Sequence, residues 1–158
     1  MNRIHLVLSD IRSAYNVGSM LRTADAAGVE KVYLCGITPT PIDRFGRRRP
    51  DIAKVALGAE NFVAWEGCED VCKTIEGLKK NGFTVVGVEQ DSHSEPYYTF
   101  TSDSAVAFVV GEETQGLTKE VLSLCDSIVE IPMRGEKESL NVSVALGIVL
   151  FGFIYKPS

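Results

Sequence analysis

The chain has 158 residues, enough for one domain with a sizeable hydrophobic core. Apolar residues make up 45% of it and charged residues 23%, which excludes a disordered or low-complexity protein. The formal net charge of −5 argues weakly against nucleic acid as a partner, so such a role needs a local concentration of positive charge.

Short apolar runs alternate with helical patterns along the chain. The runs predict strands at residues 4–8, 31–35, 62–65, 84–88, 105–110 and 127–131. Between them, apolar residues at helical spacing predict helices at residues 16–27, 51–57, 69–80, 118–124 and 141–155. The stretch 36–50, rich in Pro, Gly and Arg, is expected to be a loop. We therefore expect an α/β fold with a mainly parallel sheet flanked by helices, in a single domain over residues 1–158.

Two helix starts carry polar residues that are good caps. Asn16 is placed to cap the first helix, and either Ser139 or Asn141 the last one. That last helix is apolar almost all round but too short to span a bilayer, and the N-terminus has no signal-peptide pattern. We expect a cytoplasmic protein with no membrane partner.

The cysteines and histidines do not suggest a metal site. Cys35, Cys68, Cys72 and Cys125 form no CxxC pair, and neither they nor the two histidines show the spacing of a metal cluster. Free thiols are the expected state, and no metal is expected.

Three polar segments follow predicted strands in the C-terminal half, at residues 88–90, 111–116 and 131–141. Ligands of parallel sheets bind beyond the carboxyl ends of the strands, so a cofactor site is expected there. The 111–116 segment lacks the glycine pattern of a phosphate loop and carries two carboxylates, which favours a ligand that has positive charge or offers hydrogen-bond donors. Its glycines would let the backbone approach a ligand closely. A plain strand-to-helix turn at 111–116, and simple helix capping at 139–141, remain the alternatives.

A basic cluster lies between the second and third predicted strands. Residues 44–54 hold five positive charges against one negative charge, Asp51. Arginines offer a planar fork of donors to phosphates, so RNA contact is one interpretation, and a solvated surface loop explains the cluster equally well. The candidate RNA-binding residues are Arg44, Arg47, Arg48, Arg49 and Lys54.

Three segments in series resemble the motifs of the SpoU (TrmH) branch of the SPOUT RNA methyltransferases. The first has Asn16, Gly18 and Arg22 at the family's spacing. The second reads VVGEETQGL at residues 109–117 and continues to IPM at residues 131–133, and the third reads SLNVSVA at residues 139–145. Order, spacing and identity agree over most of the chain.

The resemblance implies a C-terminal deep trefoil knot, which the general rarity of threaded chains would otherwise argue against. It also implies a homodimer whose active site lies near the subunit interface. The implied cofactor is S-adenosyl-L-methionine. The residues that match the family's cofactor-binding loops are Val88, Glu89, Gly111, Gly116, Ile131, Met133 and Leu140.

The implied reaction is methyl transfer to a ribose 2′-hydroxyl of RNA, with tRNA favoured over rRNA and no metal involved. The family's catalytic positions match Arg22, Asn16, Glu113, Ser139 and Asn141. The high pKa of arginine makes it a poor base, so stabilisation of the alkoxide describes Arg22 better. Glu113 would orient Arg22 or contact the ribose, and Asn141 would position the hydroxyl or the cofactor.

Three other functions compete with this one. A related methyltransferase would act on a base nitrogen, which the pair of Asn16 and Arg22 argues against. A knotted RNA-binding module without activity would lack Arg22 or the 139–141 segment, and both are present. A nucleotide- or flavin-binding protein would need a glycine-rich phosphate loop after the first strand, and residues 9–13 do not form one.

Overall fold

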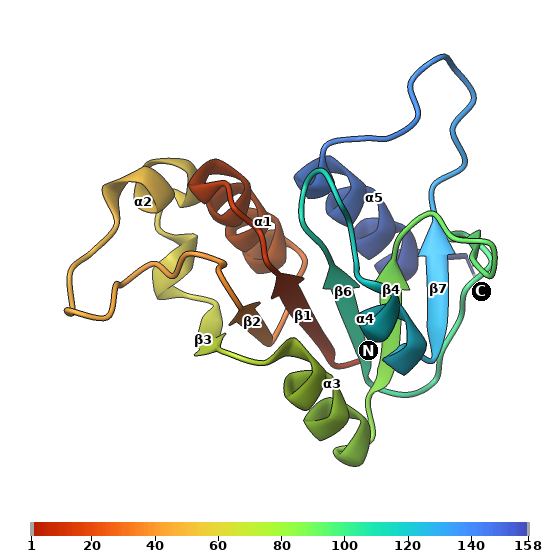
Figure 1. The fold of residues 1–158 in the computed structure, drawn as a ribbon, viewed down its shortest axis with the longest axis horizontal. Coiled ribbons are helices and arrows are strands. Elements are labelled where there is room, and N and C mark those ends of the chain that lie inside the picture. Colours follow the sequence, from red (N-terminus) through yellow and green to blue (C-terminus); the bar gives the residue numbers. More distant parts are fainter. Residues whose placement is uncertain (1, 158) are drawn as a thin grey trace.

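The computed structural model describes residues 2–157, and at its centre lies a seven-stranded sheet (Figure 1). The strand order is β3-β2-β1-β6-β4-β7-β5, and all pairings between these strands are parallel. The strands are β1 Ile4–Ser9, β2 Lys31–Cys35, β3 Ala64–Cys68, β4 Thr84–Val88, β5 Glu95–Pro96, β6 Val106–Val110 and β7 Ser127–Glu130. The helices are α1 Ala14–Ala26, α2 Pro50–Ala56, α3 Val71–Lys80, α4 Lys119–Leu124 and α5 Val142–Ile154, with a 3-10 turn at Ala59–Asn61. The predicted α/β fold with a mainly parallel sheet is confirmed.

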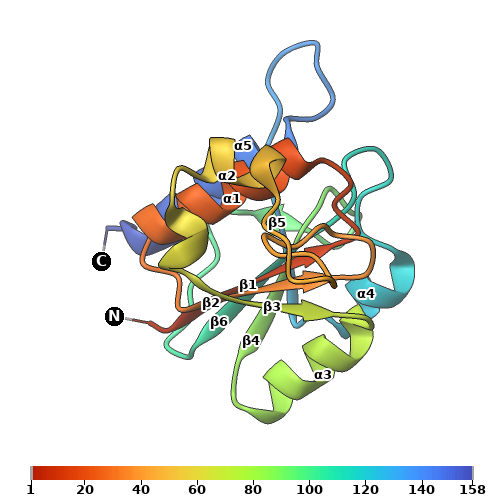
Figure 2. The same cartoon turned by 90° about the vertical axis from the view of Figure 1, so that its left-hand side faces the viewer.

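Helices cover both faces of the sheet (Figure 2). Along β1 the side chains alternate: Leu6 and Leu8 join a core cluster with residues of α1, α2 and α5, and Val7 joins a second cluster with residues of α3 and α4. All five residues of β6 are buried. Strands covered on both faces read as continuous apolar runs, which is why the sequence pattern located the central strands so closely.

The third predicted strand is wrong by two residues, because β3 begins at Ala64 rather than at residue 62. The 3-10 turn before it takes up this part of the chain, and the N–H groups of Phe62 and Val63 both donate to the carbonyl of Ala59. The side chain of Phe62 is 79% exposed. An apolar residue at this position therefore did not indicate a buried strand. The two-residue strand β5 was missed because it is too short to show a period.

Asn16 does not cap α1, contrary to expectation. Ser13 is the N-cap, and its hydroxyl accepts a hydrogen bond from the backbone N–H of Asn16. Asn16 therefore lies in the first turn with its side chain free for another partner. Of the two candidates for α5, Asn141 is the cap and accepts from the N–H of Ser143. Pro50, expected in the loop, is the first residue of α2, where its missing N–H costs nothing.

Part of the apolar surface of helix α5 is left exposed to solvent. Its 13 residues contain no charge, yet only Ser143, Leu146, Val149 and Leu150 are buried. Val144 is 51% exposed. Among residues 2–157, no helix combines the length and the apolar character of a membrane span.

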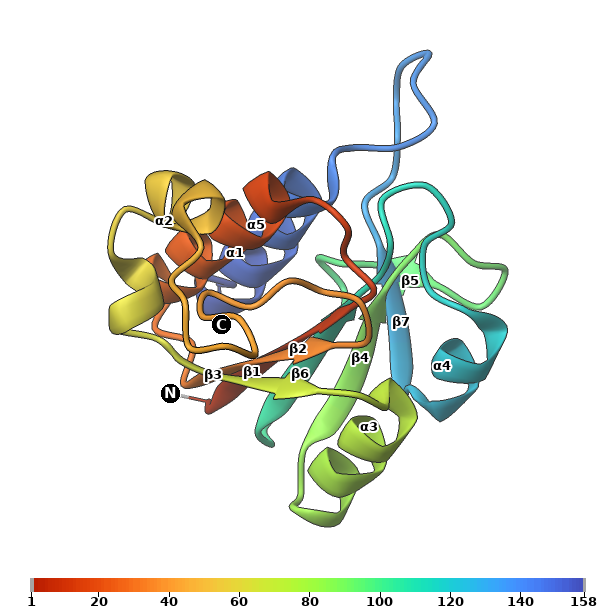
Figure 3. The same cartoon turned by 60° about the vertical axis from the view of Figure 1, so that its left-hand side comes forward.

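The strands run parallel, so their carboxyl ends share one edge of the sheet. The segments that follow β4, β6 and β7 leave the sheet at this edge, and residues 131–141 rise furthest above it (Figure 3). The start of α1, which follows β1, and the start of α5 reach the same edge. This arrangement brings together segments that are far apart in the sequence.

Candidate functional site

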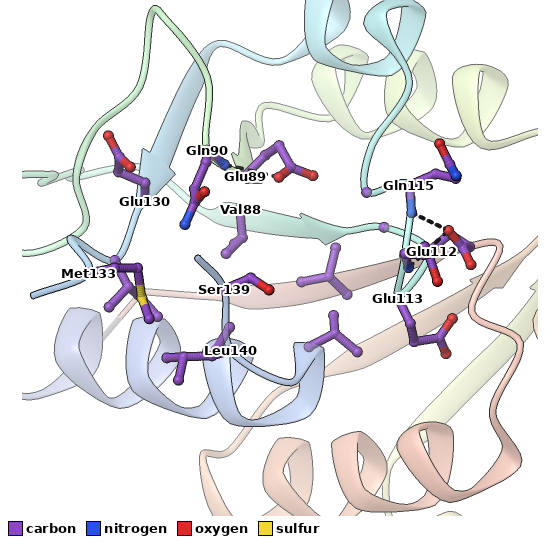
Figure 4. Close-up of a pocket in the computed structure, with 17 residues that line it drawn as sticks. Val88, Glu89, Gln90, Glu112, Glu113, Gln115, Glu130, Met133, Ser139 and Leu140 are labelled. Carbon is purple, nitrogen blue, oxygen red and sulfur yellow. Dashed lines mark hydrogen bonds between the residues drawn. The ribbon is translucent and has the colours of Figure 1, made fainter. Parts of the chain in front are cut away.

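The loops at the carboxyl edge enclose a pocket of about 190 Å³ (Figure 4). Its walls come from the ends of three strands and the segments that follow them, with the first turn of α5 beneath. The wall residues are 88–90 at the end of β4, 110–116 at the end of β6, and Glu130, Ile131, Met133, Ser139 and Leu140 at and after the end of β7. The three segments expected from the sequence to form a ligand site therefore meet in one pocket.

The structure brings most of the predicted site residues to this pocket. All seven predicted cofactor residues line it, and of the five predicted catalytic residues, Glu113 and Ser139 also line it. Asn16, Asn141 and Arg22 are not among the lining residues.

The pocket combines apolar walls with negative charge. Four carboxylates line it, whereas none of the described lining residues is Lys or Arg. Such a lining repels phosphate groups and suits a ligand that carries positive charge and an apolar ring. The carboxylates are Glu89, Glu112, Glu113 and Glu130, and the apolar side chains are Val88, Val110, Ile131, Met133, Leu140, Val142 and Ala145.

Carboxylates also hold the 111–117 loop in shape. One oxygen of Glu89 accepts from the N–H of Leu117 at 2.9 Å, and the carboxylate of Glu112 accepts from the N–H groups of Thr114 and Gln115. A side chain on Gly116, whose φ is +69°, would meet the Glu89 carboxylate. The glycines thus allow the loop to pack closely against itself and against Glu89. The expected role was only to let the backbone approach a ligand.

Three of the predicted catalytic residues form one hydrogen-bonded chain. The Asn141 amide donates to the Asn16 Oδ1 at 3.2 Å, and the Asn16 amide donates to the Glu113 Oε1 at 3.3 Å. The Ser143 hydroxyl donates to the Asn141 Oδ1 at 2.5 Å. This chain joins the starts of α1 and α5 to the loop after β6, directly beside the pocket.

Glu113 is the anchor of this chain. Its carboxylate also accepts from the backbone N–H groups of Arg12 and Ser13, both at 3.1 Å. Burial opposes ionisation of Glu113, but the hydrogen bonds from Ser13, from its own backbone, from Arg12 and from Asn16 together hold the pKa of the carboxyl below its ordinary value. Glu113 is therefore a carboxylate at neutral pH and accepts hydrogen bonds there.

Ser143 belongs to the same hydrogen-bonded chain, although the sequence did not single it out as a site residue. It lies two residues after Asn141, is buried, and orients the Asn141 amide through its hydroxyl. Its place inside the SLNVSVA segment was a usable signal, but a serine inside an apolar helix reads as part of the core.

Arg22 lies apart from the pocket of its own chain. It follows Asn16 by six residues on α1, which places it about 240° further around the helix axis. Its side chain is exposed and has no ion pair or hydrogen bond within residues 2–157. Within one chain the partners of Glu113 are Arg12, Ser13 and Asn16, and Arg22 is not among them. That Glu113 orients Arg22 or contacts the ribose therefore stays a prediction for a site shared between two subunits.

Two further contacts shape the pocket rim and were not expected. The Arg12 Nε lies 3.6 Å from a carboxylate oxygen of Glu112. The Gln90 side chain donates to the carbonyl of Glu138 at 2.7 Å and so ties the projecting 131–141 loop to the end of β4.

The cysteines form no metal centre. All four are free thiols, and no group of His, Cys, Asp and Glu within the described residues is arranged to hold a metal ion. Burial raises the pKa of Cys35 to about 12 and that of Cys125 to about 11, so neither is a thiolate at neutral pH.

The basic segment carries less free charge than its sequence suggests. Arg47 pairs with Asp43 at 2.9 Å, Arg48 with Glu60 at 3.2 Å and Arg49 with Asp51 at 2.7 Å. Asp43 and Glu60 lie outside the 44–54 stretch, so five positive charges face three negative ones. Arg44 and Lys54 have no acidic partner among the described residues. The pairs are exposed on the arginine side and weak, so the arginines stay available to a phosphate.

The chain is similar over most of its length to one group of proteins. Residues 3–151 match the SpoU rRNA Methylase family. A TrmH-family relative from Staphylococcus aureus is 36% identical over 146 residues, which are 92% of this chain and 56% of that protein. The 23S rRNA (guanosine-2'-O-)-methyltransferase RlmB of Neisseria meningitidis is 37% identical over 145 residues, 92% of this chain and 55% of that protein. The chain thus spans just over half the length of these relatives.

Solved structures of RNA methyltransferases also superpose on this chain. The AdoMet-bound rRNA methyltransferase from Sinorhizobium meliloti superposes with a TM-score of 0.86 at 26% identity, covering 95% of this chain and 55% of that one. A structure that describes the 2-OH methylation of C/U34 on tRNA superposes with a TM-score of 0.78 at 26% identity, covering 95% of this chain and 93% of that one.

Proposed function

The chain belongs to the SpoU rRNA methylase family, and on that basis we propose that it transfers a methyl group from S-adenosyl-L-methionine to a ribose 2′-hydroxyl of RNA. The observation that carries the proposal is the convergence of the three motif segments on one acidic pocket with apolar walls. Its place at the carboxyl ends of parallel strands is where α/β sheets bind ligands.

The lining of the pocket fits S-adenosyl-L-methionine. Apolar side chains such as Val88, Ile131 and Leu140 suit an adenine ring, and the surrounding carboxylates suit a positively charged sulfonium. When bound, the cofactor supplies the methyl group. The related structure from Sinorhizobium meliloti holds AdoMet, which supports this assignment. The family's deep trefoil knot in the C-terminal third remains part of the proposal.

The hydrogen-bonded chain gives the polar residues distinct roles. Glu113 fixes the Asn16 amide, Asn16 fixes the Asn141 amide, and Asn141 holds the start of α5 beneath the pocket. The three side chains thereby form a rigid polar wall against which a ribose hydroxyl can be positioned. Rigid positioning of the reacting atoms supplies much of the rate in group transfer. Ser139, on the pocket lining, is proposed to contact the same ribose.

A homodimer would complete this site. Helix α5 leaves apolar surface exposed, including Val144, and packs beside α1, which carries Arg22. A partner subunit seated on this surface would cover the apolar side chains and bring its Arg22 toward the pocket of the first subunit. Arg22 would then stabilise the alkoxide that forms at the ribose oxygen.

We propose tRNA as the substrate in preference to rRNA, and the cytoplasm as the location. A solved structure that describes the 2-OH methylation of C/U34 on tRNA superposes on this chain with a TM-score of 0.78, which supports a tRNA substrate. The 37% identity to the 23S rRNA methyltransferase RlmB makes rRNA the second candidate. The basic segment around Arg44 is the proposed RNA contact.

The first experiment is methyl transfer from labelled S-adenosyl-L-methionine to total tRNA and, separately, to rRNA. Nuclease digestion and mass spectrometry then identify the product. We expect a 2′-O-methylated nucleotide in tRNA. A methylated base would indicate transfer to a nitrogen instead. Cofactor binding by calorimetry without transfer to either RNA would indicate a module that binds but does not react.

A further inference from the structure

The basic segment folds into a small, ordered hairpin at residues 41–49, here named the basic hairpin. Its two sides are joined by hydrogen bonds from the N–H of Arg49 to the carbonyl of Pro41 and from the N–H of Asp43 to the carbonyl of Arg47. Residues Ile42 and Arg48 form an antiparallel bridge.

Asp43 holds the tip of the basic hairpin in one conformation. One oxygen of its carboxylate accepts from the N–H of Phe45 at 2.8 Å and from the N–H of Arg47 at 2.9 Å. The other oxygen pairs with the Arg47 Nε at 2.9 Å. Gly46, at φ +77°, closes the turn with an N–H bond to the Asp43 carbonyl. A surface loop kept only for solubility does not need this ordering.

Phe45 is presented to solvent at this ordered tip. Its side chain is 66% exposed, and it belongs to neither core cluster. The guanidinium carbons of Arg44 and Arg47 lie 4.8 Å and 5.0 Å from the centre of its ring. An exposed aromatic ring with arginines close to it can bind RNA in two ways at once. An unpaired nucleobase takes the place of a guanidinium on the ring face and stacks there, and the arginines meet the flanking phosphates.

The basic hairpin also lies on the correct side of the molecule for such a contact. It follows the carboxyl end of β2, and the pocket lies at the carboxyl ends of β6, β4 and β7 in the same parallel sheet. In Figure 1 the segment bulges out at the left, beside α2. From β2 to β4 there are three strand spacings, about 15 Å, which a few nucleotides of RNA can cover.

We infer that Phe45 is a stacking site for an unpaired nucleobase of the RNA substrate, next to phosphates held by Arg44 and Arg47. The inference rests on the proposed function only in taking RNA as the ligand. The basic hairpin would then prefer single-stranded RNA to a duplex. Its positive charge alone cannot produce this preference, because a duplex offers the same phosphates but no free base.

The test measures equilibrium binding of a short oligouridylate and of an RNA duplex of equal length, without cofactor. Phe45→Ala should weaken binding of the single strand about 5- to 150-fold, the range for one lost stacking contact. Binding of the duplex should stay nearly unchanged. Phe45→Tyr should retain the affinity and Phe45→Leu should not, because leucine is apolar but has no ring face.

Salt dependence separates stacking from charge. Phe45→Ala should leave the slope of affinity against salt concentration unchanged, whereas Arg44→Gln should reduce it, because only the arginine displaces counterions. Phe62→Ala is the matched control, since Phe62 is also highly exposed but lies outside the basic hairpin. Both phenylalanine variants should melt at the wild-type temperature.

Three outcomes would overturn the inference. One is wild-type affinity of Phe45→Ala for the single strand, another is an equal loss for strand and duplex, and the third is no binding of the single strand by the wild-type chain. A change in sedimentation mass without a change in RNA affinity would assign Phe45 to a protein interface instead. None of these readouts depends on methyl transfer, so failure of the proposed reaction is seen separately, in the transfer assay.

Discussion

At the scale of single residues, the site depends on the direction of its hydrogen bonds. The Ser143 hydroxyl donates to the Asn141 carbonyl oxygen, so the Asn141 amide nitrogen is turned toward Asn16, and the Asn16 nitrogen in turn toward Glu113. Because the Glu113 carboxylate can only accept, every hydrogen bond in this series must donate in the same direction, from Ser143 toward Glu113. A buried serine with no contact to the pocket thereby sets the orientation of two amides beside it.

We therefore expect Ser143→Ala to impair the reaction more than cofactor binding. The loss of one buried hydrogen bond should lower the free energy of unfolding by about 1 kcal/mol. The turnover number should fall by up to about 10-fold, because Asn141 loses one of the two hydrogen bonds that fix its side-chain oxygen and keeps only the one from the backbone N–H of residue 143. Steady-state kinetics and calorimetry measure the two effects. Ser143→Thr, which keeps the hydroxyl, should restore most of the activity, and if it does not, the effect of Ser143 is one of packing.

Glu113 should make the folding stability sensitive to acid. Its pKa in the folded state lies below the value of 4.5 expected of an unperturbed carboxyl, so the folded chain binds fewer protons than the unfolded chain in that range. The stabilisation is present above pH 4.5 and is lost as the pH falls through the lowered pKa. Urea unfolding from about pH 7 to about pH 3 measures it. In Glu113→Gln this part of the pH dependence should disappear, and an unchanged profile would show that the carboxylate adds no net stability.

At the scale of elements, the basic hairpin and helix α5 each have a surface that the chain itself does not use. The basic hairpin is stabilised by Asp43 within it and by Asp51 and Glu60 outside it, so three of its arginines are ordered without being buried. Helix α5 is stabilised on one side by the sheet and α1, and Val144 remains exposed. The first surface suits a polyanion and the second an apolar partner.

Replacing Arg47, Arg48 and Arg49 together with Gln should weaken RNA binding and flatten its salt dependence. Each phosphate contact removed should reduce the slope of log affinity against log salt by about 0.7 for single-stranded RNA. Fluorescence anisotropy over a series of salt concentrations measures this. Because Arg48 also pairs with Glu60, the melting temperature serves as a control for folding. Unchanged RNA affinity would exclude these three arginines from the RNA contact.

At the scale of the whole molecule, one chain does not bring all the predicted catalytic residues together. Asn16, Glu113, Ser139 and Asn141 gather at the pocket, and Arg22 lies elsewhere on α1. We therefore expect a catalytic Arg22 to come from a second subunit. The exposed apolar side of α5, which packs beside α1, is the surface through which we expect that subunit to bind.

Arg22→Ala should abolish methyl transfer and leave cofactor affinity nearly intact, because Arg22 does not line the pocket of its own chain. If the site is shared, mixing Arg22→Ala with Asn141→Ala should restore activity. Each mixed dimer then contains one site in which both residues are wild type. Transfer assays before and after subunit exchange measure this. No recovery in dimers shown to be mixed would place both residues in one chain's site, and equal loss of transfer and cofactor binding would make Arg22 structural.

The sequence by itself determined the elements and the region of the site. Its continuous apolar runs predict strands buried on both faces, and such strands are parallel, so the segments after residues 88, 110 and 130 had to meet at one edge. These are local patterns joined by one topological rule. Motif resemblance added the identity of the polar residues, although not their contacts.

Only the tertiary structure decided which polar groups pair. Asn16 and Glu113 are 97 residues apart in the sequence, and Asn141 and Asn16 are 125 apart. Their contact depends on the strand order, which places β1 beside β6, and on the packing of α1 against α5. Likewise, Glu60 neutralises part of the charge of the basic hairpin by pairing with Arg48. Adding up the charges of residues 44–54 does not include Glu60. Hydrogen bonds and ion pairs act over a few ångströms in space, so a sequence pattern can indicate which residues are able to form them but not which of them come within reach.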